Sequence, residues 1–224
     1  HGMRNSIETD WILKMGQAIL DRTDGKAMVL AVNWGEGAFG FLDLLPHESA
    51  SYVPEVAKVV FDQLTSLEIV PGNTTLIGHS HGGHIAGQIV YYYANKNGGD
   101  FKRMVGLDVS TTDWSVHGWL PKLFEASREF SFLPWLKGFS PSKWYAAVEK
   151  HCKQSEFYKT SFDMSLEEPN ELFAQWNFSV VSGEGEFYET TAGFVAHDER
   201  ERHSYAWEWF INTIKNANGK YDNK

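Results

Sequence analysis

Short apolar runs alternate with longer stretches in which apolar residues recur every three or four positions. The helical spacing predicts helices over residues 7–20, from Pro54 to Leu67, over 84–95 and over 204–216. The continuous apolar runs predict strands covered on both faces, over residues 27–32, 74–77, 104–107 and 178–181. Strands that alternate with helices are typical of βαβ units, so we expect an α/β fold with a mostly parallel sheet and helices on both faces.

Residues 115–175 interrupt this alternation, because they show no clear strand pattern and are rich in aromatic residues. The segment lies between two predicted strands, so we expect a helical insertion over one edge of the sheet. Its rings could wall a substrate pocket as a lid or simply pack the insertion onto the sheet, since aromatic side chains dominate cores as well as pockets. The candidates for substrate contact are Trp119, Phe124 and Trp135.

Composition narrows the classes of function. The length of 224 residues suits one domain over 1–224, and the net charge of −9 argues against a nucleic-acid partner, which needs a basic face. No apolar run approaches the roughly 20 residues of a membrane span. Because Cys152 is the one cysteine, an intrachain disulfide and a cysteine-rich zinc site are excluded. We expect no cofactor, and the sequence gives no oligomeric state.

The clearest chemical signal is Gly78-His79-Ser80-His81-Gly82, which fits the pattern G-x-S-x-G between a predicted strand and a predicted helix. In that context the turn holds the serine in a strained conformation and exposes its hydroxyl as a nucleophile. The start of the helix supplies amide donors and the positive end of a dipole. The alternative is a glycine-rich turn with an unreactive serine.

A nucleophilic serine needs an orienting acid and a base, which follow it in the order Ser, Asp/Glu, His. Asp108 ends the strand over 104–107, so it should lie beside Ser80 at the carboxyl edge of the sheet. The alternatives are a turn aspartate at 108 and a catalytic acid at Glu184 or Glu186. For the base we favour His203, directly before the closing helix, over His197, and either histidine could instead be a solvated surface residue.

A second sequence pattern indicates an alternative chemistry, a metal site formed by histidines. His79, His81 and His84 have the spacing of the H-x-H-x-D-H metal motif of metallo-β-lactamase-like hydrolases, with Gly83 at the aspartate position. The other histidines that could complete a zinc site are His117, His151 and His197. A turn like that described above would direct the three motif histidines apart, and zinc needs convergent ligands. We therefore predict no metal site.

Five segments together resemble the pancreatic lipase family. Residues 78–87 resemble its GHSLGAH-x-AG motif, Gly106-Leu107-Asp108 its GLDPA motif, and residues 203–210 its H-x-R-S-Y-x-Y-F motif. Val32-Asn33-Trp34 is similar to its V-D-W strand end, and His1-Gly2-Met3 to its H-G-F loop. The likeness covers residues 1 to about 110 and about 195 to 214. Departures include Asn33 for Asp and Val109-Ser110 for Pro-Ala.

The resemblance implies an α/β-hydrolase fold and a triad of Ser80, Asp108 and His203. It implies an oxyanion hole formed by the backbone N–H groups of His81 and Met3. The substrate would be an ester or lipid ester, met at a lipid–water interface, and the protein would be secreted. The family's calcium site and bridged lid have no recognisable counterpart over 111–195. The strand that precedes the family's H-G-F loop is missing before His1, so we expect upstream residues, a fragment or a tag remnant.

The sequence thus predicts a lipase-like serine ester hydrolase that works through an acyl-enzyme. The alternatives within this chemistry are a phospholipase A1-type enzyme and a short-chain or aryl carboxylesterase. Three alternatives use a different chemistry or substrate. They are a non-catalytic lipase-like binding module, a histidine-based metallohydrolase, and a dienelactone-type or peptidase activity, since a fold does not fix a substrate.

Overall fold

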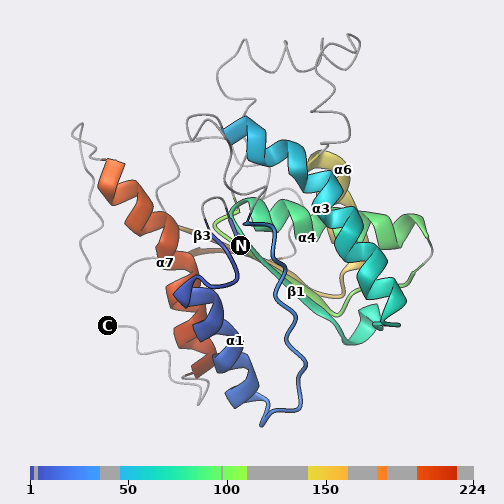
Figure 1. Ribbon diagram of the computed structural model, residues 1–224, viewed down its shortest axis with the longest axis horizontal. Coiled ribbons are helices and arrows are strands. Elements are labelled where there is room, and N and C mark those ends of the chain that lie inside the picture. Colours follow the sequence, from blue (N-terminus) through green and yellow to red (C-terminus); the bar gives the residue numbers. More distant parts are fainter. Residues whose placement is uncertain are drawn as a thin grey trace.

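The computed structural model describes residues 1–2, 5–35, 46–96, 98–109, 141–160, 176–180 and 196–215 (Figure 1). Helices and strands alternate along these residues. In chain order they are α1 (Asp10–Arg22), α3 (Pro46–Ser66), the 3₁₀ turn η1 (Pro71–Asn73), β1 (Thr75–His79), α4 (His81–Asn95), β2 (Arg103–Leu107), α6 (Pro141–His151), β3 (Ser155–Thr160), β4 (Trp176–Val180) and α7 (Ala196–Lys215).

The four described strands form one parallel sheet in the order β1-β2-β3-β4. The register pairs Ile77 with Val105, and Gly106 with Phe157. Each strand therefore lies beside its neighbour in the sequence, and all carboxyl ends meet at one edge. The expectation of an α/β fold with a parallel sheet is confirmed, and three of the four predicted strands are present with shifted ends.

Helices cover both faces of the sheet, as predicted. Met104 and Phe157 belong to a core shared with α3, α4 and α6, whereas Val105 and Tyr158 belong to a core shared with α1 and α7. Successive residues of β2 therefore enter opposite cores, as the period of two in a strand requires. Figure 1 shows α1 and α7 side by side, with α3 and α4 together on the other side of the sheet.

The predicted strand over residues 27–32 is wrong. Residues 28–34 belong to no helix or strand, and Met28 and Leu30 are 67% and 50% exposed. A strand forms only where a neighbour pairs with its backbone, and within the described residues no strand pairs with this segment. The apolar run indicated a buried strand, but a pattern alone does not supply a partner.

The predicted helical insertion over 115–175 is also corrected. Of this range the structure describes residues 141–160, which hold α6 and the sheet strand β3. β3 pairs with both β2 and β4, so it lies within the sheet and not over its edge. It was missed because Glu156 interrupts its apolar pattern, although the Glu156 side chain is only 5% exposed.

Helix ends differ from the predicted ones. α3 begins at Pro46, so Pro54 lies inside the helix and not near its start, at the cost of one backbone hydrogen bond. α7 begins at Ala196, eight residues before the predicted start. Both His197 and His203 therefore belong to this helix, and neither lies in a loop before it.

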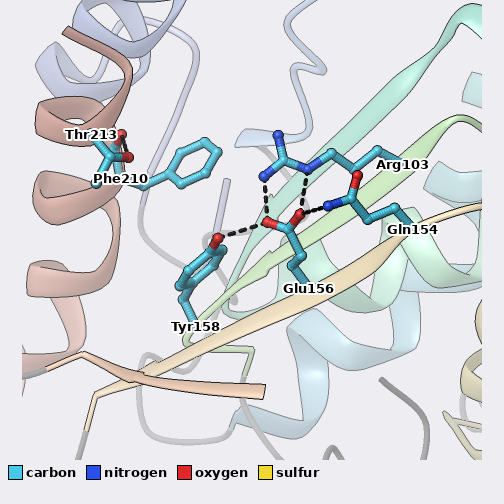
Figure 2. Close-up of polar contacts among 6 residues, drawn as sticks. All are labelled: Arg103, Gln154, Glu156, Tyr158, Phe210 and Thr213. Carbon is cyan, nitrogen blue, oxygen red and sulfur yellow. Dashed lines mark hydrogen bonds and ion pairs between the residues drawn. The ribbon is translucent and has the colours of Figure 1, made fainter. Parts of the chain in front are cut away.

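A buried carboxylate connects β2 and β3 under α7 (Figure 2). Arg103 donates from Nε to Glu156 Oε1 over 2.9 Å and from Nη2 to Oε2. Tyr158 donates its hydroxyl to Glu156 Oε2 over 2.7 Å, and Gln154 donates to Oε1. The Arg103 guanidinium lies 6.0 Å from the centre of the Phe210 ring of α7. Three donors thus compensate the desolvation of one carboxylate at the amino end of β3.

Arg103→Met should lower the free energy of unfolding by about 3 kcal/mol, because removing one partner of a buried pair leaves a charge without its counter-ion. Chemical denaturation followed by circular dichroism measures this. The control is Arg103→Met with Glu156→Met, which removes both charges and should recover most of the loss. A single variant as stable as the wild type would show that the pair contributes nothing.

Candidate active site

Ser80 is the turn residue between β1 and α4, as the G-x-S-x-G pattern predicted. Its backbone has φ 52° and ψ −126°, a conformation that residues with a side chain rarely adopt. Such a conformation costs about 1–3 kcal/mol and persists only where the surroundings enforce it. Ser80 donates its N–H to the Leu107 carbonyl of β2 over 3.0 Å, and its own carbonyl accepts from Gly83 over 3.0 Å. These contacts hold the strained turn at the carboxyl edge of the sheet.

Glycines allow the strand and the helix to approach each other at this turn. A Cβ on Gly78 would lie 2.6 Å from the Gly83 nitrogen, too close for any side chain. A Cβ on Gly82 would lie 2.8 Å from the His1 carbonyl oxygen. The first turn of α4 is therefore enclosed between β1 and the first residues of the chain, which places its amide end at Ser80.

Asp108 occupies the matching position on the next strand. His79 pairs with Leu107 in the β1–β2 register, so Ser80 and Asp108 each follow the last residue of neighbouring strands. Asp108 has φ 40° and donates its N–H to the Tyr158 carbonyl over 2.7 Å. The residue is 8% exposed. Ser80 and Asp108 thus lie at the ends of adjacent strands, which is the placement that the sequence predicted.

His1 and Gly2 lie on Ser80. A Cβ added to Gly2 would come within 2.7 Å of the Ser80 Cβ and 3.3 Å of its Oγ, so only glycine fits there. Ser80 is 4% exposed. The expectation that the turn exposes the serine hydroxyl is therefore wrong. The physical reason is this close backbone contact, which comes from 78 residues earlier in the chain.

Both candidate bases lie on α7, and their side chains are outside the described residues. His203 lies four residues before Trp207 and seven before Phe210, which places all three on one stripe of a helix with 3.6 residues per turn. Phe210 is buried, and the Trp207 ring stacks on Trp11. His197, six residues before His203, falls on another side of the helix. The helix register thus favours His203.

Of the histidines of the metal-like pattern, His79 lies apart from the other two, whereas His81 and His84 are neighbours. His79 lies edge-on to Trp11 of α1, with ring centres 5.5 Å apart. His84 forms a 3.0 Å hydrogen bond through Nδ1 to the hydroxyl of Tyr145 in α6, on the opposite side of the sheet. His81 is 2% exposed, and its ring centre lies 6.0 Å from that of His84. Within the described part of the chain no three His, Cys, Asp or Glu side chains could hold a metal ion together.

The remaining predicted site residues fall outside the described residues. They are Met3, the aromatic candidates Trp119, Phe124 and Trp135, and the alternative acids Glu184 and Glu186. Two of the aromatic residues that are described within the predicted insertion are Trp144 and Tyr145 of α6. Trp144 and Tyr145 are 1% and 2% exposed and pack in the core against α4. These two rings therefore pack in the core and do not form a pocket wall.

Sequence reasoning missed the hydrogen bond between His84 and Tyr145. Burial raises the pKa of the Tyr145 phenol far above its usual value, so the hydroxyl keeps its proton and remains a donor. The bond connects the first turn of the helix after Ser80 to α6. A signal was present, because a histidine and a tyrosine each stand at an inward position of a helix, but their pairing depends on how the helices cross.

The comparisons with known proteins add no relative: no protein-family model matches the chain, and no curated protein matches it. Among the described helices, none is both long and apolar enough to cross a membrane.

Proposed function

We propose that the chain is a serine ester hydrolase of the α/β-hydrolase type that cleaves acyl esters through an acyl-enzyme. One observation carries this proposal. Ser80 and Asp108 lie at the ends of adjacent parallel strands, and both adopt positive φ values. Nucleophilic hydrolases need a strained serine at a strand–helix turn and a carboxylate within reach of a shared histidine. The consecutive order of β1 to β4 and helices on both faces support the same architecture.

In the proposed mechanism the Ser80 Oγ attacks the ester carbonyl carbon while His203 accepts the hydroxyl proton. Asp108 holds the imidazole in the correct tautomer and stabilises the imidazolium. The carbonyl oxygen becomes an oxyanion, which the N–H groups of His81 and Met3 bind. His203 then protonates the leaving alcohol as the carbon–oxygen bond breaks. Water repeats the sequence on the acyl-enzyme and releases the acid.

The proposed substrate is an acylglycerol or a similar lipid ester, and a shorter or aryl ester is the variant within the same chemistry. p-Nitrophenyl esters of two to sixteen carbons, assayed with and without EDTA, test both points. The proposal predicts hydrolysis that EDTA leaves unchanged, with the highest kcat/KM on the longer chains if the enzyme is lipase-like. Activity that EDTA removes and zinc restores would instead indicate a metallohydrolase.

Asp108→Asn should lower kcat about 10⁴-fold, because the amide holds the histidine in the wrong tautomer while preserving the shape of the site. Stopped assays with p-nitrophenyl butyrate measure the loss. The matched control is Glu184→Gln, for which we expect kcat within threefold of the wild type. The reverse pattern, with Asn at 108 tolerated and Gln at 184 inactive, would make Glu184 the catalytic acid.

A further inference from the structure

A hydrogen bond between two buried side chains joins α4 to α6 close to Ser80. The Tyr145 hydroxyl of α6 lies 3.0 Å from Nδ1 of His84, and the two ring centres are 5.7 Å apart. His84 and Tyr145 are 1% and 2% exposed, so the bond is shielded from water. A hydrogen bond in such surroundings is electrostatically stronger than in water, and the loss of one partner is costly. The pair therefore restrains the position of α4 relative to α6.

The His84 end of this bond belongs to the turn that carries Ser80. His84 is the fourth residue of α4, and Gly83, directly before it, donates its N–H to the Ser80 carbonyl over 3.0 Å. A Cβ on Gly83 would lie 2.3 Å from a methyl carbon of Val109, so the same turn packs against the residue that follows Asp108. A displacement of His84 therefore shifts the turn relative to Asp108.

The Tyr145 end of the bond contacts the strand that holds Asp108. The Tyr145 ring meets the Phe157 ring of β3 edge-on, with centres 5.6 Å apart. Phe157 pairs with Gly106 of β2, and its ring leaves no room for a Cβ at that glycine. The next residue of β3, Tyr158, accepts the Asp108 N–H through its carbonyl over 2.7 Å. Tyr145 thus contacts both the helix after the nucleophile and the strand that fixes Asp108.

We propose that Tyr145 and His84 are positioning residues whose hydrogen bond sets the distance between the nucleophile and its acid. This inference is built on the proposed function and deepens it. The packing of the turn on Val109 limits how closely the turn and the end of β2 can approach. The hydrogen bond opposes their separation. Ser80 and Asp108 act through one imidazole, so an error of about 1 Å in their placement can cost about 100-fold in rate.

Tyr145→Phe tests the proposal, because it removes the hydroxyl and keeps the ring. We expect kcat for p-nitrophenyl butyrate to fall about tenfold with KM within threefold, since the change disturbs the reacting groups and not substrate binding. The matched control is Tyr93→Phe, the same change in the same core. The Tyr93 hydroxyl is buried without a hydrogen-bond partner among the described residues, so kcat should stay within threefold. Wild-type kcat in Tyr145→Phe would overturn the proposal.

Variants of His84 separate positioning from a contribution to stability alone. His84→Asn keeps an acceptor at the place of Nδ1 and should retain kcat within threefold, whereas His84→Leu removes the acceptor and should lose about tenfold. Tyr145→Phe combined with His84→Leu removes both polar partners, so it should regain stability without regaining kcat. Recovery of kcat together with stability would show a structural role only and would overturn the proposal, as would equal losses in the Asn and Leu variants.

Amide hydrogen exchange tests the same connection without an activity assay. Tyr145→Phe should accelerate exchange at Gly83 and Asp108, whose N–H groups hold the turn and the end of β2 in place. Tyr93→Phe should leave both amides as in the wild type. Unchanged exchange at both amides in Tyr145→Phe would refute the connection. A wild-type protein that hydrolyses no ester would refute the proposed function, and the exchange data would still decide whether the pair sets this geometry.

Discussion

Ser80→Ala is expected to lower kcat for p-nitrophenyl esters by about 10⁶, as loss of the nucleophile does in triad hydrolases. The effect is large because the alternative, direct attack by water, retains only the help of the oxyanion donors. Stability should change little, since alanine keeps the Cβ that contacts Gly2 and meets the same backbone conformation as serine. Kinetics and thermal melts on the same preparation separate the two effects.

The control for this variant is Ser66→Ala. Ser66 ends α3, and its hydroxyl donates to the Gln63 carbonyl at an exposed site. It should retain wild-type kcat. A Ser80→Ala protein that keeps activity within tenfold of the wild type would end the proposal of a serine nucleophile.

His203→Ala should lower kcat by a similar factor of about 10⁶, because serine and base act as one unit in proton transfer. His197→Ala, on another side of the same helix, should leave kcat within threefold. The pair is well matched, since both changes remove an imidazole from α7. The reverse result would make His197 the base, and loss of activity in neither variant would remove α7 from the mechanism.

Much of the fold could be predicted because its elements follow local patterns. α1, α4 and the strands β1 and β2 bury one face or both, and their apolar spacing shows this directly. β3 could not be predicted, because the buried Glu156 looks like a surface residue until Arg103 is known to lie opposite. The prediction of a strand over 27–32 failed for the opposite reason. Its residues are apolar, but the described part of the chain provides no strand that pairs with them.

Some features of the candidate site could likewise be predicted from the sequence, and others could not. Ser80 and Asp108 follow strands, so parallel topology alone brings them together at one edge. The contact of Gly2 with Ser80 joins residues far apart in the chain, and only the family resemblance suggested it. The hydrogen bonds from the Trp34 indole to the His1 carbonyl and from the Trp11 indole to Asn5 Oδ1 had no signal in the sequence. They depend on how the packed elements lie in space.

The most direct test of the central claim is labelling with a fluorophosphonate probe, followed by mapping of the modified peptide. We expect one modified residue, Ser80, in the folded wild-type protein, and no labelling of Ser80→Ala. A probe that leaves the folded wild type unmodified, or that labels the variant equally, would contradict an activated serine at the end of β1.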